Sequence, residues 1–270
     1  MRADPSIDPT QPGSGEAGGR ALAGSQTLVR GLEVLQSVAA GATNLAELSQ
    51  ALGLTRSTAH RLAATLVEHR YLTFTPRVGY ALGAKLLELG YLAGQQMSLP
   101  RIARDHLERL AGSTGDTVHL GVLDGSRALY LDKLPGGRRI EISSRVGERQ
   151  PLRSTGLGKA LILDGDQAHW RELYAFEDAI GGHRYGVDLA QWLGRMRDYA
   201  GRGYAFDLEE NEDRIRCVAA PVRDVSRKIV GAISVSSAAQ YMDDERMARL
   251  SEEVMGAARA ISADLGWSPP

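Results

Sequence analysis

A short polar run at residues 55–61 has the side chains expected of a surface that contacts DNA. An arginine can donate two hydrogen bonds to one guanine, and a threonine or serine can reach a base or a phosphate. Backbone N–H groups at the start of a helix also bind phosphate. The residues of this run expected to contact DNA are Thr55, Arg56, Ser57, Thr58, His60 and Arg61. Arg77, further along the chain, is expected to reach the DNA backbone or the minor groove.

The helices predicted before this run have the order of a helix-turn-helix. Apolar residues three or four apart predict a first helix that begins at Gln26. These residues are Leu28, Leu32, Leu35 and Val38. Asn44 can cap a second, short helix in which Glu47 completes a capping box, and Gly53 supplies the turn after it. A third helix after such a turn is presented to the major groove of DNA.

The third helix is predicted from Thr55, which can cap it, to about His69. Its positions Ala59, Leu62 and Leu66 share one face and should pack inward. The polar side chains of the run are then left on the outer face, near the helix N-terminus.

Two short strands and a long helix should follow. Strands at 71–74 and 80–82 flank the turn that holds Arg77, and a helix at 84–96 comes next. The predicted division of the chain is a disordered tail at 1–24, a winged helix-turn-helix domain at 25–83, a linker helix at 84–99, a second domain at 100–266 and a tail at 267–270. The first tail lacks the apolar surface needed to offset the entropy of ordering.

The second half of the chain is predicted to be α+β with a mainly antiparallel sheet. Asp124-Gly125 between two apolar runs indicates a hairpin. Predicted strands lie at 117–123, 128–133, 140–145, 204–208, 215–223 and 229–236. Predicted helices lie at about 102–113, 157–163, 167–179, 189–201 and 243–265.

The composition limits the classes of protein that remain. The chain has 270 residues, a formal net charge of −1 and one cysteine, so an internal disulfide is excluded. No apolar run is long enough for a membrane span, no signal peptide begins the chain, and a cytoplasmic location is expected. Residues 21–83 carry five arginines against three glutamates, which modestly favours DNA. The alternative is a three-helix domain that binds protein.

Several separated motifs resemble one family. The run from Asn44 to Leu62 closely resembles the helix-turn-helix of the IclR family of bacterial transcriptional regulators. Further motifs that resemble the family are Tyr80–Gly83, Lys85–Gly90, Ser154–Ala160 and Arg216–Val222. The resemblance extends from about Gln26 to Leu265. One departure is Arg70, where a glycine often precedes the tyrosine of the first wing strand.

The resemblance implies a winged helix-turn-helix, a linker helix and a C-terminal GAF/PAS-like domain that binds a small effector. It also implies a homodimer, commonly a dimer of dimers, on a palindromic operator. No cofactor, no metal site and no catalytic residue are expected.

The resemblance also implies an effector pocket. The positions carried over to it are Thr155, Gly156, Leu157, Asp207, Cys217, Ser234 and Ser236. The loop at 154–157 opens a helix whose N–H groups suit a carboxylate. Ser234 and Ser236 are two apart and so share a strand face. Gly158-Lys159 is not a nucleotide-binding loop, because Arg153 replaces the earlier glycine and Ala160 the Ser or Thr.

Each pocket residue also has a purely structural interpretation. A lone buried cysteine is usually a small core hydrophobe. Asp207 could cap the end of a strand, and the two serines could simply lie on a sheet face. His119 could enter the pocket, but a structural histidine with satisfied hydrogen bonds is the preferred interpretation.

The effector itself is less well defined by the sequence. Motifs around 118–121, 144–152 and 207–211 are similar to those of family members that sense sugar acids, so the expected effector is a 2-keto-3-deoxy sugar acid or related hydroxycarboxylate. A regulator of aromatic-acid catabolism is the alternative. Two rivals from other classes are an enzyme with Cys217 as nucleophile and His119 or His183 as base, and a redox sensor that uses Cys217.

Overall fold

The computed structural model describes residues 25–96, 98–138, 142–179 and 187–269. The chain forms two compact units, Met1–Gln95 and Gln96–Pro270. The predicted tail at 1–24 lies outside the described residues, as do His183 and the last residue of the second predicted tail.

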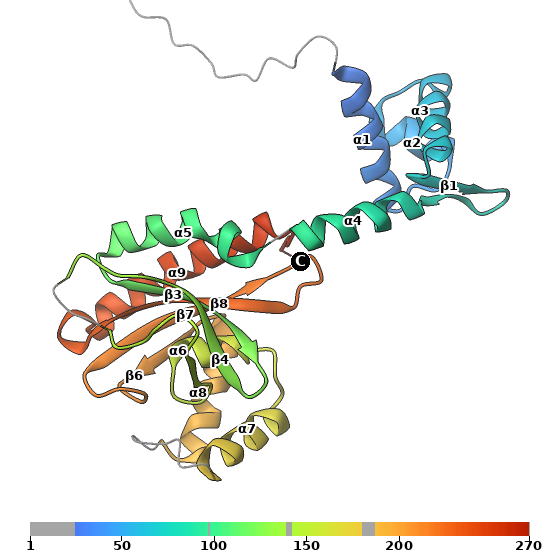
Figure 1. The fold of residues 1–270 in the computed structure, drawn as a ribbon. Helices are drawn as coiled ribbons and strands as arrows, with labels where there is room; N and C mark the ends of the chain where they lie inside the picture. Colours follow the sequence, from blue (N-terminus) through green and yellow to red (C-terminus); the bar gives the residue numbers. More distant parts are fainter. Residues whose placement is uncertain (1–24, 97, 139–141, 180–186, 270) are drawn as a thin grey trace, which may run out of the picture. The chain divides into compact units, whose positions relative to one another are not determined.

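The first unit combines four helices with a hairpin (Figure 1). Its elements are α1 (Gln26–Ala39), α2 (Leu45–Leu52), α3 (Arg56–Glu68), β1 (Leu72–Thr75), β2 (Gly79–Leu82) and α4 (Ala84–Gln96). β1 and β2 pair antiparallel, from Leu72 opposite Leu82 to Thr75 opposite Gly79. The predicted order of helices and strands is confirmed.

Local hydrogen bonds explain where α2 and α3 begin. The Asn44 side chain accepts from the N–H groups of Ala46 and Glu47, at 3.0 and 3.1 Å. The Glu47 carboxylate accepts from Thr43 N–H at 2.7 Å, which lowers the pKa of Glu47. Thr55 Oγ1 caps α3 by accepting from Thr58 N–H at 3.3 Å. Each cap fixes the residue at which its helix begins.

The inward face of α3 is as predicted, and the core covers only part of the predicted apolar face of α1, namely Leu35 and Val38. Ala59 and Leu62 are buried, and Leu66 packs against the same core. On α1, Val34 and Val38 fill the core, while Leu28 and Leu32 are 66% and 50% exposed. Periodicity identifies an apolar face of a helix, but it does not show which part of that face this domain covers.

The second unit is a six-stranded antiparallel sheet, among the described residues, with the strand order β5-β4-β3-β8-β7-β6. The strands are β3 (Thr117–Asp124), β4 (Arg127–Leu134), β5 (Arg149–Pro151), β6 (Ala205–Leu208), β7 (Ile215–Arg223) and β8 (Ile229–Ala238). The helices are α5 (Leu99–Thr114), α6 (Gly156–Leu161), α7 (Gln167–Ala179), α8 (Leu189–Arg202) and α9 (Asp244–Asp264), and a 3-10 turn spans Ala239–Tyr241.

Helices cover both faces of this sheet (Figure 1). α5 and α9 pack on one face, where Leu107, Val218 and Val254 belong to one apolar core. α6, α7 and α8 pack on the other face, where Leu157, Trp192 and Ala219 belong to a second core. Val218 and Ala219 are neighbours on β7, so their side chains point to opposite faces.

The strand predicted at 140–145 is wrong where the structure describes it. Residues 140 and 141 lie outside the described residues, and residues 142–145 are not in a strand. The Lys133 ammonium donates to the carbonyls of Ile142 and Ser144, at 2.6 and 2.7 Å. A side chain therefore takes the carbonyls that a strand would use, and the edge strand β5 forms later, opposite Arg127–Leu129.

The helix after α4 starts earlier than predicted. α5 begins at Leu99 rather than near Ile102, with Pro100 in its first turn. Proline is tolerated there because the first N–H groups of a helix have no partner within the helix.

Candidate DNA-reading surface and effector cavity

The outer face of α3 presents most of the predicted DNA-contacting run. Arg56, Ser57, His60 and Arg61 are exposed. The hydroxyls of Thr55 and Thr58 lie 2.9 Å apart at the N-cap. Thr55 therefore holds the start of the helix, and the charged and exposed side chains after it are free to meet a ligand.

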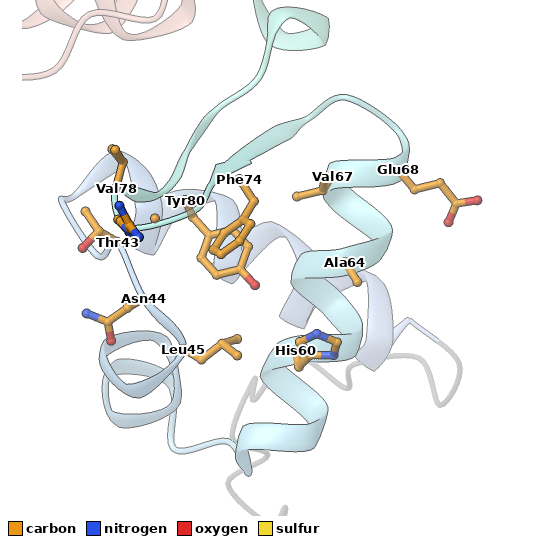
Figure 2. Close-up of a pocket in the computed structure, with 12 residues that line it drawn as sticks. Thr43, Asn44, Leu45, His60, Ala64, Val67, Glu68, Phe74, Val78 and Tyr80 are labelled. Carbon is orange, nitrogen blue, oxygen red and sulfur yellow. The ribbon is translucent and has the colours of Figure 1, made fainter.

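The hairpin, the start of α2 and one side of α3 line a groove with a volume of about 850 Å³ (Figure 2). Figure 2 shows Phe74 and Tyr80 of the hairpin between Leu45, at the start of α2, and the side chains of α3. His60 and Arg77 both line this groove. The predicted wing residue and the predicted reading helix thus contribute to one concave surface.

The turn of the hairpin projects away from the domain core. Arg77 has φ +70°, and the next residue, Val78, is 72% exposed. Phe74 packs against Tyr80 with ring centroids 4.9 Å apart. The aromatic pair braces the hairpin, so the turn is held at a fixed place beside α3.

A second cavity, with a volume of about 80 Å³, lies in the second unit. It collects six of the seven predicted effector positions, which are Thr155, Gly156, Leu157, Asp207, Cys217 and Ser236. Ser234 is buried and interacts with Cys217 without lining the cavity. The other residues that line the cavity are His119, Tyr130, Ile142, Ser143, Ser144, Gln150, Asn211, Glu212 and Ile215.

Strand register explains why residues far apart in the sequence meet here. Asp207 on β6 is opposite Cys217 on β7, and Cys217 is opposite Ser236 on β8. These three side chains form a row across the sheet. The start of α6 packs on this row, because a Cβ at Gly156 would lie 2.9 Å from Cys217 Sγ. Only glycine allows this close approach.

The start of α6 also leaves donors at the cavity. Thr155 Oγ1 accepts from Gly158 N–H at 2.9 Å and donates to Pro151 O at 2.6 Å. The N–H groups of Gly156 and Leu157 have no acceptor among the described residues. Both residues line the cavity, so these donors are available to an anion or a hydroxyl there.

Asp207 has both of the roles that the sequence left open. One carboxylate oxygen accepts from Glu210 N–H at 2.8 Å and from Asn211 N–H at 3.4 Å, which caps the end of β6. The same side chain lines the cavity. Burial raises the pKa of Asp207 to about 7, although the nearby Lys159 ammonium opposes this shift. The carboxyl is therefore partly protonated near neutral pH.

His119 lines the cavity with a polar atom whose lack of a partner the sequence does not reveal. Its Nε2 lies 2.7 Å from Ser144 Oγ, and its Nδ1 is buried without a hydrogen-bond partner. Burial, with a smaller contribution from Lys133, lowers the pKa of His119 to about 3. The neutral imidazole therefore brings an unsatisfied polar atom to the cavity, contrary to the preferred interpretation of a satisfied structural histidine.

Cys217 does not have the properties of a nucleophile or of a redox sensor. Burial raises the pKa of the Cys217 thiol to about 11, and only 5% of the residue is exposed. Reactive cysteines are exposed thiolates with a lowered pKa. Cys217 is accordingly a small wall residue that packs against Gly156. Among the residues that the structure describes, no cluster of His, Cys, Asp and Glu could hold a metal ion.

Two family profiles match this chain. The profile described as "IclR helix-turn-helix domain" matches residues 27–76. The profile described as "Bacterial transcriptional regulator IclR C-terminal" matches residues 92–263. In the part of the chain that is described, no helix is long and apolar enough to cross a membrane.

Curated relatives match over nearly their whole length. The chain is 34% identical over 251 residues to the HTH-type transcriptional regulator XynR of Escherichia coli (strain K12), covering 90% of this chain and 98% of that protein. It is 32% identical over 254 residues to the acetate operon repressor of Salmonella typhimurium, covering 89% and 90%.

Solved structures show the same fold. The Agrobacterium tumefaciens repressor BlcR matches with a TM-score of 0.75 and 25% identity, over 89% of this chain and 97% of that one. The Thermotoga maritima IclR matches with a TM-score of 0.57 and 28% identity, over 89% and 99%.

Proposed function

Because the chain belongs to the IclR family of DNA-binding bacterial transcriptional regulators, we propose that it is a repressor whose operator binding is controlled by a small hydroxycarboxylate of the sugar-acid class. The observation that carries the proposal is the unpartnered Nδ1 of His119 at a hydroxyl-lined cavity. Buried polar atoms are almost always hydrogen-bonded, so this one points to a ligand. Relatives that are named as repressors support repression rather than activation.

The operator is contacted by the exposed face of α3 and by the hairpin turn. Arg56 and Arg61 supply guanidinium groups for guanine or phosphate, and Ser57 and His60 lie on the same exposed face. Arg77 is the wing contact, supported by its place in the same groove as His60. Thr55 and Thr58 hold the helix start, where backbone N–H groups can meet a phosphate.

Arginine substitutions on α3 test this interface. We expect Arg56→Ala and Arg61→Ala each to weaken operator binding by about 1–3 kcal/mol if the side chain contacts a base. Fluorescence anisotropy with an operator duplex, selected from random DNA by the protein itself, measures the change. Arg249→Ala on α9 is the matched control, because Arg249 is an exposed arginine in the other unit. Equal affinity for all four proteins would remove both arginines from the interface.

The cavity lining supports a hydroxylated acid as the ligand. Ser144, Ser236 and Tyr130 offer hydroxyl groups, and Asp207 can accept hydrogen bonds from ligand hydroxyls. No lysine or arginine is among the described lining residues, and the imidazole of His119 is neutral, so the ligand carboxylate must meet neutral donors. The N–H groups of Gly156 and Leu157 are such donors.

The size of the cavity favours a short ligand. Its volume of about 80 Å³ is well below that of pockets for drug-sized ligands, about 300–1,000 Å³. The smaller hydroxycarboxylates therefore fit better than a large sugar acid. An aromatic acid, the effector of the alternative proposal, would place a ring against hydroxyl and carboxyl groups, which the lining favours less.

Apolar side chains on the first unit support the proposed homodimer. Leu28, Val29 and Leu32 on α1 are 45–66% exposed, and Leu87 on α4 is 79% exposed. The exposed side chains on α1 lie on one helix face, which a second copy of the chain would cover. In a homodimer, the two reading helices would contact the two half-sites of a palindromic operator. Such a regulator acts in the cytoplasm, where the bacterial chromosome lies.

A further inference from the structure

A crevice of about 140 Å³ lies on the edge of β7, away from the effector cavity. β6 begins at Ala205, opposite Ala219, so the last residues of β7 extend past the start of β6. Pro221 lies in this uncovered stretch, where it leaves no N–H unpaired. Ala220, Met255 and Ala258 supply apolar lining.

Trp267 is held at the crevice by the way α9 ends. Gly266 has φ +83°, and its N–H donates to Ala263 O at 2.9 Å. The Trp267 N–H donates to Ser262 O at 2.9 Å. These two bonds form the motif in which a left-handed glycine closes a helix and returns the chain across its last turn. The backbone of Trp267 is therefore held at the crevice, which this residue lines.

Three arginines and no acidic residue line the crevice, and these arginines are Arg202, Arg223 and Arg259. The Arg223 guanidinium donates to both carboxylate oxygens of Asp164, at 2.6 and 2.7 Å. Neither of the other two takes part in an ion pair among the described residues, and Arg202 is hydrogen-bonded to the Tyr204 side chain. The Arg259 guanidinium lies 3.9 Å from Met255 Sδ. An anion in the crevice would therefore meet two guanidinium groups without displacing a carboxylate.

The crevice is independent of the effector cavity. Ala220 belongs to the core under α9, whereas Cys217 and Ala219 belong to the core under α6. The crevice lies at the edge of the sheet and shares no lining residue with the effector cavity. A ligand in one does not occupy the other.

We propose that this crevice is a second binding site, which takes a small aromatic monocarboxylate. An apolar cavity of about 150 Å³ holds benzene, so the volume here suits one six-membered ring. The ring lies on the apolar lining beside the Trp267 indole. The carboxylate takes charge-assisted hydrogen bonds from Arg202 and Arg259.

Calorimetric titration of the full chain with benzoate tests the proposal, with the fluorescence of the half-buried Trp267 as a second readout. The double variant Arg202→Gln/Arg259→Gln is expected to bind benzoate at least about tenfold more weakly, since two charge-assisted hydrogen bonds are lost. Both arginines are exposed, so the variant is expected to fold. Arg249→Gln, an exposed arginine elsewhere on α9, is expected to bind like the wild type.

Three comparisons test whether benzoate binds in this crevice and whether binding needs both its charge and its ring. Asp207→Asn, in the effector cavity, should leave benzoate binding unchanged. Benzyl alcohol and inorganic phosphate should both bind more weakly than benzoate, because each lacks either the charge or the ring. The proposal is overturned if benzoate does not bind, if Asp207→Asn rather than the arginine variant removes binding, or if phosphate or benzyl alcohol binds as tightly.

Discussion

Arg70 holds a backbone conformation that suits glycine. Its φ is +63°, just after the end of α3. The Arg70 N–H donates to Val67 O at 2.9 Å, and the Tyr71 N–H donates to Leu66 O at 2.8 Å. The same pair of bonds closes α2 at Gly53, where the residue is a glycine. A non-glycine residue in this conformation costs roughly 1–2 kcal/mol.

Substitution of Arg70 by glycine should therefore stabilise the first unit. We expect Arg70→Gly to raise the free energy of unfolding by about 1 kcal/mol, after the entropy that glycine adds to the unfolded chain. Arg61→Gly, in the interior of α3, should lower the free energy of unfolding by about 1 kcal/mol. Urea unfolding followed by circular dichroism measures both. A destabilised Arg70→Gly would show that the Arg70 side chain contributes more than its backbone strain costs.

The Asp207 carboxyl should make stability depend on pH. Its pKa is raised from 3.8 to about 7 in the folded chain, mainly by burial. A folded pKa above the unfolded value means that the folded state holds the proton more tightly between these two pH values. The resulting stabilisation is full below about pH 4 and is lost as pH rises through about 7.

Asp207→Asn removes this titration and keeps an oxygen that can accept from Glu210 N–H. We expect the variant and the wild type to be similarly stable near pH 4. At pH 8 the variant should be more stable, by on the order of 4 kcal/mol at most. Denaturant unfolding at both pH values gives the difference. An equal gap at the two pH values would contradict a raised pKa for Asp207. His119 has its pKa lowered instead and titrates in both proteins, so it cancels in the comparison.

At the scale of elements, the exposed apolar face of α1 is the feature that the fold of one chain does not explain. Burying one leucine side chain contributes roughly 1.5–3 kcal/mol. Leu28→Gln/Leu32→Gln should therefore raise the dissociation constant of the proposed homodimer by at least about tenfold without unfolding the chain. Sedimentation over a range of concentrations measures this constant.

Val225→Gln is the matched control, because Val225 is 74% exposed at a hairpin in the other unit. It should leave the association of the chain unchanged. If the double variant also sediments like the wild type, the face on α1 is not the interface between copies.

The sequence predicted most elements because their limits are set locally. α7 has the predicted range, and the helix caps at Asn44 and Thr55 form as expected. The strand predicted at 140–145 is wrong because the Lys133 ammonium, nine and eleven residues away in the chain, takes its carbonyls. Such a contact depends on the folded sheet and has no local sequence pattern.

The cavity was predicted through family motifs rather than through spacing. Asp207, Cys217 and Ser236 meet because three strands pair in one register, and no local pattern in the sequence gives that register. For His119 the sequence favours a structural role over a role in the pocket, because it does not show that Nδ1 lacks a hydrogen-bond partner. The family motifs therefore identify which residues line the cavity, whereas their hydrogen bonds are known only from the structure.

At the scale of the whole molecule, each activity has its own core. The proposed DNA-reading surface rests on the core around Val34 and Leu48, and the proposed effector cavity rests on the core around Leu157 and Trp192. Substitutions in the cavity should therefore leave DNA binding intact while they remove its control. Coupling requires the effector to bind one arrangement of the DNA-bound protein better than another.

Operator affinity measured with and without a hydroxycarboxylate tests the central claim most directly. We expect glycerate or 2-keto-3-deoxygluconate to weaken operator binding by the wild type at least about fivefold in fluorescence anisotropy, the lower end of typical coupling. Asp207→Ala should bind the operator with wild-type affinity and show no response to either acid. An operator affinity that neither acid changes, or a response that survives in Asp207→Ala, would contradict control of DNA binding by this cavity.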